Sequence, residues 1–510
     1  MDKFQILDCT LRDGGYYTNW DFGPVIVDAY IEAVNQLPID YIEVGYRNLP
    51  EKDYMGEFGY TPASTLEHIR KQSTRKIAVM INEKSVRVSD LPSLLGPIKG
   101  LADMVRMAVS PDNFDRAVAL GREVKAMGFD VAFNLMYMSK WDQYDGLFEK
   151  MPQLNGVATI LNMVDSFGSM MPDQVTATIK KLKTILDCKL GFHGHNNLQM
   201  GLANTLAAID CGIDSVDATV LGMGRGAGNL NIELLLTTLN RQGLEVDFNV
   251  LGDMILAFRP LLEEYRWGTS LPYMISGANS IPQKEVMALV TNRVYSFNNI
   301  VRAVDNKRIH VADNAHYPLL DAPSCEEVLI IGGGQSVSAH INAIKRYLLH
   351  HPDVAIVFAT TRHAALFDDV SNKKYYVLVG NEAKRMLKTV PQDNYQGCCV
   401  LPPYPRLMGT DVPTYAQSST FELPKVSFIN RYADSCTTVA LQIAIELQSK
   451  RVNIVGYDGY RGQILSDKEL TLTSENRELF ETFSKNVGTL YSLTPSLFSA
   501  LKSESIYQLI

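Results

Sequence analysis

The first 240 residues of the chain alternate short apolar runs with longer stretches in which apolar residues recur every three to four positions. The short runs have the composition of buried strands, and the longer stretches have the period of amphipathic helices. The runs recur roughly every 25 to 35 residues, the size of a strand–helix unit. We therefore predict a TIM (β/α)8 barrel over residues 1–240, because an open doubly wound sheet would need a break in the series. The predicted strands are FQILDC, YIEVGY, KIAVMI, ADMVRMAV, DVAFNLM, GVATILNMV, KLGFHG and DSVDATV.

The pattern becomes mostly helical after the barrel, over residues 241–320. We expect breaks at Pro260, Pro272 and Pro282, because proline lacks the N–H that a helix interior needs. This segment is predicted to be a helical extension that packs on the barrel.

An α/β rhythm restarts near Asp321 and predicts a second, Rossmann-like domain over residues 321–510. Its first strand leads into Gly332-Gly333-Gly334-Gln335-Ser336, which could hold a phosphate at a helix N-terminus or could merely allow close strand–helix packing. The segments LIIGGGQSV and LQIAIELQSKRVNIVGYDGY resemble archaeal-type hydroxymethylpterin pyrophosphokinases, which implies a nucleotide-like ligand. The further strands predicted here are DVAIVFAT, YYVLVG, KVSFIN and VNIVGYDG.

Composition narrows the class of protein. The net charge is -8 and no basic face is evident, so we expect no nucleic-acid partner. The seven cysteines show no CxxC spacing, which is typical of a reducing cytoplasm. The start MDKFQILDCT has no apolar signal region and no stretch has the length of a membrane span, so we expect a cytoplasmic protein without membrane contact.

Polar residues gather where the predicted barrel strands end, and a barrel enzyme builds its site at that pole. In His193-Gly194-His195 the two imidazoles point to the same side of an extended strand. Asp13 follows the first strand. In a closed ring of eight strands the first and seventh strands are two apart, close enough to share a metal ion. A carboxylate and two imidazoles suit an octahedral ion with open positions, such as Mn²⁺ or Mg²⁺, and Co²⁺ or Fe²⁺ also fit. The polar residues at these ends are Arg12, Asp13, Glu43, Asn82, Arg106, Asn134, Asp165, His193, His195 and Asp217.

The segments LDCTLRDGG and GFHGHNNLQMGLANTLAAIDCGIDSVDATVLGMGRGAGN resemble the DRE-TIM metallolyases (HMG-CoA lyase-like), and most of all their 4-hydroxy-2-oxovalerate aldolase branch. YIEVGY, DMVRMAV and MVDSFGSMMP extend the resemblance. It implies that Arg12 stabilises an enolate and that Glu43 orients this arginine. It also implies that Asp13, His193 and His195 bind the metal, with Asn229 as an additional metal-site residue.

One position departs from the aldolase pattern. Those enzymes have a histidine three residues after the metal-binding aspartate, whereas this chain has Tyr16 there. Tyr16 is therefore the candidate acid–base group, and Tyr17 and Tyr137 are alternatives. Asp165 and Tyr137 are candidate substrate-binding residues, although Asp165 could equally cap the following helix.

We interpret the chain as a divalent-metal-dependent aldolase or lyase that works through the enolate of a 2-oxo acid, with pyruvate favoured. Its partners would be a small-molecule 2-oxo acid and an aldehyde, and we expect a homo-oligomer. An acyl-CoA-dependent Claisen synthase or acyl-CoA lyase on the same scaffold is one alternative. A non-catalytic ligand-binding or regulatory protein is another.

Overall fold

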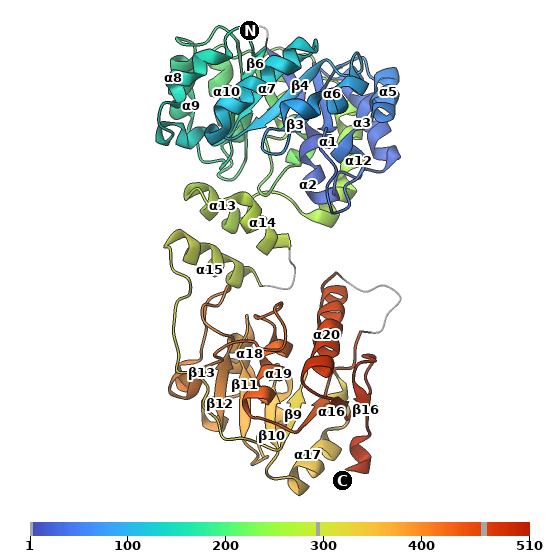
Figure 1. Ribbon diagram of the computed structural model, residues 1–510, viewed down its shortest axis with the longest axis vertical. Helices are drawn as coiled ribbons and strands as arrows, with labels where there is room; N and C mark the ends of the chain where they lie inside the picture. The colour runs from blue at the N-terminus through green and yellow to red at the C-terminus, as the bar shows by residue number, and fades with distance from the viewer. Residues whose placement is uncertain (1–3, 292–295, 461–466) are drawn as a thin grey trace. The chain divides into compact units, whose positions relative to one another are not determined.

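The computed structural model describes residues 4–291, 296–460 and 467–510. The chain forms two compact units, Met1–Thr291 and Asn292–Ile510, which run from blue to yellow-green and from yellow to red in Figure 1. The predicted extension over residues 241–320 spans this division. Its helices α12 (Phe248–Tyr265), α13 (Leu271–Ala278) and α14 (Gln283–Thr291) belong to the first unit, and α15 (Phe297–Arg308) belongs to the second.

The first unit is a closed barrel of eight parallel strands in the order of the sequence, as predicted. The first strand pairs with the second and also with the eighth, which closes the ring. The eighth strand also pairs with the seventh, so the first and seventh strands are two apart as expected. The strands are β1 (Gln5–Asp8), β2 (Tyr41–Tyr46), β3 (Lys76–Asn82), β4 (Met104–Val109), β5 (Asp130–Leu135), β6 (Ile160–Asp165), β7 (Lys189–Gly194) and β8 (Ser215–Ala218).

Amphipathic helices surround the barrel. In α3 the buried positions Val27, Tyr30, Ile31 and Val34 recur at helical spacing, and Pro24 supplies a first residue that needs no N–H partner. The helices are α1 (Thr10–Asp13), α2 (Gly15–Thr18), α3 (Pro24–Gln36), α4 (Glu57–Tyr60), α5 (Ala63–Gln72), α6 (Leu91–Leu95), α7 (Phe114–Ala126), α8 (Leu147–Lys150), α9 (Pro172–Leu182), α10 (Gly201–Asp210) and α11 (Ile232–Asn240).

The turn after β1 is set by Asp8. Its Oδ1 accepts hydrogen bonds from the backbone N–H of Thr10 at 2.9 Å and from the hydroxyl of Tyr30 at 2.6 Å. Burial raises the pKa of Asp8 to about 6, although these two hydrogen bonds oppose the rise. The turn leads into α1, which carries Arg12 and Asp13 at the carboxyl pole of the barrel.

Helices α12 (Phe248–Tyr265), α13 (Leu271–Ala278) and α14 (Gln283–Thr291) complete the first unit. The expected break at Pro260 is wrong, because this proline lies inside α12. Leu251, Met254 and Phe258 of this helix are buried in the barrel core, and that packing outweighs one missing backbone hydrogen bond. Pro272 lies in the first turn of α13, and Pro282 directly precedes α14.

Helices α13 and α14 are fixed to the loops that follow β6 and β7. The side-chain amide of Gln283 donates to Oδ1 of Asn197 at 2.8 Å and to the carbonyl of Ser166 at 3.1 Å. Asn197 in turn donates to the carbonyl of Tyr273 at 3.0 Å. These helices therefore support the pole at which the strands end.

The second unit holds an eight-stranded parallel sheet in the order β13-β12-β11-β10-β9-β14-β15-β16. The strand order reverses between β9 and β14, as in Rossmann-like folds. The strands are β9 (Glu327–Ile331), β10 (Ala355–Phe358), β11 (Lys374–Val377), β12 (Cys398–Leu401), β13 (Thr420–Glu422), β14 (Arg451–Val455), β15 (Leu490–Ser492) and β16 (Lys502–Ser503). The helices are α15 (Phe297–Arg308), α16 (Ser336–Ala339), α17 (Ile341–His350), α18 (Glu382–Thr389), α19 (Cys436–Glu446) and α20 (Asp467–Asn486).

The predicted strand KVSFIN is wrong, because residues 425–430 form a loop after β13. Their apolar character has another cause, since Phe428 is buried in the core of this unit. The backbone N–H of Ser427 donates to the side chain of Gln442 on α19 at 2.9 Å instead of to a neighbouring strand.

The glycines after β9 allow close packing. A Cβ on Gly332 would lie 2.5 Å from the carbonyl oxygen of Gly456, and one on Gly334 would lie 2.5 Å from Oδ1 of Asp458. Asp458 also accepts from the backbone N–H of Ser336 at 2.9 Å, where a phosphate would otherwise bind. This geometry favours the packing explanation of the glycine run. Within the described residues, every helix of the chain is too short or too polar to span a lipid bilayer.

Candidate active site and metal centre

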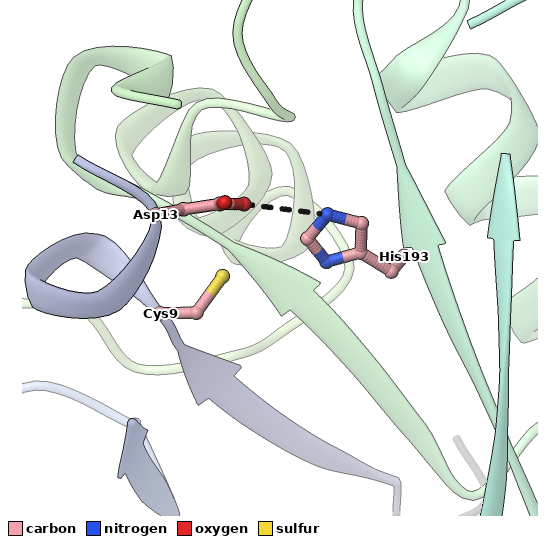
Figure 2. Close-up of side chains that lie close together, drawn as sticks. All are labelled: Cys9, Asp13 and His193. Carbon is pink, nitrogen blue, oxygen red and sulfur yellow. Dashed lines mark ion pairs between the residues drawn. The ribbon is translucent and has the colours of Figure 1, made fainter. Parts of the chain in front are cut away.

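The four predicted metal-site residues all lie at the carboxyl pole of the barrel. Asp13 comes from α1, His193 from β7, His195 from just beyond β7, and Asn229 from the loop after β8. Nε2 of His193 lies 3.5 Å from Oδ2 of Asp13, and the two groups point toward each other (Figure 2). Asn229 donates to the same Asp13 oxygen at 2.7 Å, and its backbone bridges that of His195.

Both imidazoles are oriented through Nδ1. In His193 this atom lies 2.9 Å from Oδ2 of Asp217, and in His195 it lies 2.8 Å from the carbonyl oxygen of Asp165. A carbonyl can only accept, so Nδ1 of His195 carries the proton and Nε2 keeps its lone pair. Removal from water, followed by the nearby His193, lowers the pKa of His195 to about 3. His195 is therefore neutral at physiological pH, as a metal ligand must be.

Arg12 is held between two carboxylates. Its Nε donates to Oε2 of Glu43 at 2.8 Å, and its Nη1 forms an ion pair with Oδ1 of Asp13. Glu43 is therefore in direct contact with the guanidinium that the family resemblance implies it orients. Burial alone would raise the pKa of Asp13, but the positive charge of Arg12, together with the proximity of His193 and His195, outweighs burial and lowers the pKa to about 2.

A second arginine continues the arrangement below the pole. Arg106, which is fully buried on β4, donates to Oε2 of Glu43 at 3.0 Å and forms an ion pair with Asp217. Asp217 also contacts His193, and His193 faces Asp13, which is paired with Arg12. The contacts therefore form a closed ring. We call this set of six buried side chains the charged ring: Asp13, Arg12, Glu43, Arg106, Asp217 and His193.

The donor set fits a divalent ion. Two adjacent ligands that each lie about 2.1 Å from one octahedral ion are about 3.0 Å apart, and the Asp13–His193 separation of 3.5 Å is close enough for both groups to reach one ion. Oδ1 of Asn229 is buried and lacks a hydrogen-bond partner in the described structure, so this oxygen is available as a further ligand.

Cys9 is a neighbour that the sequence interpretation did not include. Ligand atoms of Cys9, Asp13 and His193 all lie within 4.8 Å of one another, and His195 is not a member of that trio (Figure 2). The Cys9 thiol donates to the carbonyl of Ala218 at 3.6 Å, and burial raises its pKa well above the usual value. It is therefore a protonated thiol at the base of the site.

Tyr16 lies in a group of aromatic side chains two helical residues beyond the turn that follows Asp13. Its hydroxyl is 3.0 Å from the hydroxyl of Tyr46, and its ring meets Trp20 edge-on with 4.9 Å between centroids. The guanidinium of Arg225 lies 3.9 Å from the centroid of the same ring. Trp20 is fixed in turn by a hydrogen bond of 2.8 Å to the carbonyl of Arg12.

The remaining candidates are engaged in other contacts. The hydroxyl of Tyr17 donates to the carbonyl of Gly226 at 3.0 Å, and burial raises its pKa well above the usual value, which makes it a poor base. Tyr137 packs its ring on Phe167 with 5.5 Å between centroids, and the structure does not bring it to the charged ring.

The Asp165 side chain forms hydrogen bonds within the loop that follows β6. It accepts from the backbone N–H groups of Ser169 at 3.2 Å and Met170 at 3.1 Å. Burial raises its pKa to about 6 against these hydrogen bonds. Its contact with the metal-site residues is made by the backbone carbonyl that orients His195.

Sequence reasoning placed Arg106 and Asp217 at the polar pole without giving them a role, and it quoted Arg225 only within a glycine-rich run. The signal for Arg106 and Asp217 was a charged residue inside an otherwise apolar strand, because such a charge must be paired when the strand is buried. No comparable signal marked Arg225, since a charged residue in a surface loop is ordinary.

Comparisons with known proteins identify relatives of the barrel half of the chain. The HMGL-like family model matches residues 103–255. A 4-hydroxy-2-oxovalerate aldolase of Geobacillus thermodenitrificans is 32% identical over 268 residues, which cover 49% of this chain and 74% of that protein. An oxaloacetate decarboxylase of Mycobacterium tuberculosis is 29% identical over 241 residues, covering 47% of this chain and 70% of that protein.

A solved structure also matches the barrel half of the chain. The N-terminal domain of a candidate aldolase from Bacteroides vulgatus is 60% identical, with a TM-score of 0.56, and the match covers 59% of this chain and 100% of that domain. The Geobacillus aldolase is 32% identical to this chain over 74% of its own length, and a likeness of this extent assigns the family. The barrel, the family model and these relatives together show that the chain belongs to the HMGL-like (DRE-TIM) family, whose members matched here include aldolases and a decarboxylase.

Proposed function

We propose that the protein is a divalent-metal-dependent aldolase that cleaves or forms a carbon–carbon bond through the enolate of a 2-oxo acid, with pyruvate as the favoured nucleophile. The observation that carries the proposal is the position of Arg12, which Glu43 and Asp13 hold beside the metal-site imidazoles. A fixed cation next to a metal site is what a developing enolate requires. The aldolase and decarboxylase relatives support this reaction class.

Asp13, His193 and His195 are the proposed metal ligands, with Asn229 as an additional one, and Mn²⁺ or Mg²⁺ is the favoured ion. The ion, when bound, acts as a Lewis acid toward the keto oxygen and carboxylate of the substrate. Asp217 and the carbonyl of Asp165 hold the imidazoles so that each Nε2 is available.

Arg12 supplies positive charge at the oxygen on which the enolate develops. In the described residues its Nη2 donates no hydrogen bond, while Nε and Nη1 are taken by Glu43 and Asp13. The fork is therefore fixed in direction and retains a donor for the substrate. Because the guanidinium is already held in place, little reorganisation accompanies the chemical step.

Tyr16 is the proposed acid–base group for the hydroxyl of the 4-hydroxy-2-oxo acid. Its hydroxyl contacts that of Tyr46, and Trp20 and Arg225 hold its ring from two sides. A group in this role must reach the substrate hydroxyl by a direct hydrogen bond or through one water. Asp165 and Tyr137 would contribute to the substrate pocket through the loops that follow β6 and β5.

Exchange of the pyruvate methyl protons with solvent tests the proposal. The protein is loaded with Mg²⁺, which unlike Mn²⁺ is diamagnetic and does not broaden NMR signals. It is then incubated with pyruvate in D₂O. We expect loss of the methyl signal at a rate that depends on metal, and loss of exchange in His193→Ala. An acyl-CoA lyase or a non-catalytic binding protein would show no such exchange, so its absence would contradict the proposal.

A further inference from the structure

Arg225 lies beside Tyr16 and has no anionic partner among the residues that the structure describes. It is in the loop between β8 and α11, where its guanidinium stacks on the ring of Tyr16. In the described parts of the chain this side chain donates no hydrogen bond and forms no ion pair, whereas Arg12 and Arg106 each contact two carboxylates. Arg225 is also half-buried, so its charge is only partly solvated.

The stacking leaves the donors of Arg225 free. All five guanidinium N–H groups lie in the plane of the group, and the tyrosine ring covers only one face. A fork whose donors have no partner among the described residues matches a carboxylate or phosphate. Burial would lower the pKa of Arg225, but the nearby Tyr16, Tyr46 and Asp13 outweigh it and raise the pKa, so the residue is charged under all ordinary conditions.

The loop that carries Arg225 is fixed on both sides. The carbonyl of the next residue, Gly226, accepts from the Tyr17 hydroxyl at 3.0 Å. Asn229 bonds to Asp13, and the N–H of Gly228 bonds back to the carbonyl of Arg225 at 3.2 Å. The cation is thus held in a defined position relative to the metal-site residues, as a specificity-determining group must be.

We propose that Arg225 binds a second anionic group of the substrate, so that the preferred substrate is a 4-hydroxy-2-oxo acid with a carboxylate at the end remote from its keto acid. This inference rests on the proposed function, since it assumes that the keto-acid end binds beside Arg12 and the metal. The relative named oxaloacetate decarboxylase is named for a 2-oxo acid that carries such a second carboxylate.

The reaction for such a substrate is a retro-aldol cleavage. In 4-hydroxy-2-oxoglutarate the C4 hydroxyl gives its proton to the base, the C3–C4 bond breaks, and its electron pair forms the enolate of pyruvate. Glyoxylate leaves with its carboxylate, and the enolate takes a proton at C3 to become pyruvate. In 4-hydroxy-2-oxovalerate a methyl group replaces the remote carboxylate, and the other product is acetaldehyde.

These two substrates therefore form a matched pair for the test. We expect kcat/KM to be about ten- to a hundredfold higher for 4-hydroxy-2-oxoglutarate, the range for hydrogen bonds to a charged group. Arg225→Gln should remove most of this preference, mainly through KM for the dianionic substrate. Arg225→Lys should keep part of it, because the charge remains without the fork. Arg122→Gln, at an exposed site on α7, is the control and should keep the preference.

Binding provides a readout that does not depend on turnover. Calorimetry of the Mn²⁺-loaded protein compares 2-oxoglutarate with 2-oxovalerate, which has the same carbon chain and lacks the second carboxylate. We expect tighter binding of 2-oxoglutarate, and loss of the difference in Arg225→Gln. A parent that binds both equally, or an Arg225→Gln variant with unchanged discrimination, would overturn the role of Arg225. Absence of pyruvate exchange with intact discrimination would instead overturn the proposed reaction.

Discussion

Oδ2 of Asp217 lies 2.9 Å from Nδ1 of His193 and is also paired with Arg106. Burial would raise the pKa of Asp217, but Arg106 and His193 outweigh it and lower the pKa. Asp217 thus stays ionised beneath the site and directs Nε2 of His193 toward Asp13. The charged ring therefore orients the side chains of the site, because each of its members is held by contacts with its two neighbours.

Asp217→Asn should weaken metal binding without removing it. The variant removes the negative charge that orients His193, and changes of this kind cost about ten- to a hundredfold in metal affinity. Titration of the metal-free protein with Mn²⁺, followed by electron paramagnetic resonance, measures the effect. Asp214→Asn near the opposite end of β8 is the control, and an unchanged affinity in Asp217→Asn would mean that His193 is oriented by other groups.

His193→Ala should empty the site. One of the proposed ligands is lost, and the remaining carboxylate of Asp13 is already paired with Arg12, so the ligands that are left bind a cation weakly. Elemental analysis of the purified variant should show far less than one divalent ion per chain, against one per chain in the parent. Stoichiometric metal in the variant would show that the ligand assignment is wrong.

Arg12→Lys should abolish turnover, with a loss well above tenfold, while metal content and fold remain. Lysine keeps the charge but cannot hold Glu43, Asp13 and an enolate oxygen together with one planar fork. Pyruvate proton exchange and elemental analysis on the same sample separate the two effects. Near-normal exchange in this variant would remove Arg12 from the mechanism.

Tyr16→Phe separates an acid–base role from a structural one. If the hydroxyl carries the proton, the pH–rate profile loses a limb and pyruvate exchange falls. A nearly silent variant would assign the proton transfer to a metal-bound water or another side chain. Tyr16→His, which introduces the residue of the aldolase pattern, should restore or raise cleavage of 4-hydroxy-2-oxo acids if the chain works as those enzymes do.

Asp8 should make the protein less stable as the pH rises. Its pKa is raised from 3.8 to about 6 in the folded chain, so between these values the folded state binds more protons than the unfolded state. The associated stability is present below pH 3.8 and is lost as the pH rises through 6, by up to about 3 kcal/mol. Denaturant unfolding at several pH values should show a smaller change in Asp8→Asn. The exposed Asp28→Asn serves as the control, and a change equal to that of the parent in Asp8→Asn would contradict the assignment.

The sequence predicted the barrel because strand and helix periods are local properties, and each predicted run coincides with a strand. It failed at Pro260 and at KVSFIN, where packing against other elements decided the structure. The metal-site residues could be named from their types and motif, but the pairing of Arg106 with Glu43 and Asp217 depends on residues 63 and 111 positions away along the chain. The stacking of Arg225 on Tyr16 likewise follows only from the folded loop.

The bond between Asp13 and Asn229 joins residues that are 216 positions apart. At about 5 to 20 residues per second, synthesis of that length takes roughly 10 to 40 s. For most of this interval the nascent chain carries Asp13 and Arg12 but not the strand β8 that pairs with β1. The metal-site residues therefore come together only when the barrel closes, which is slow because the paired strands are distant in sequence. An ion that binds at this stage would stabilise the closed barrel.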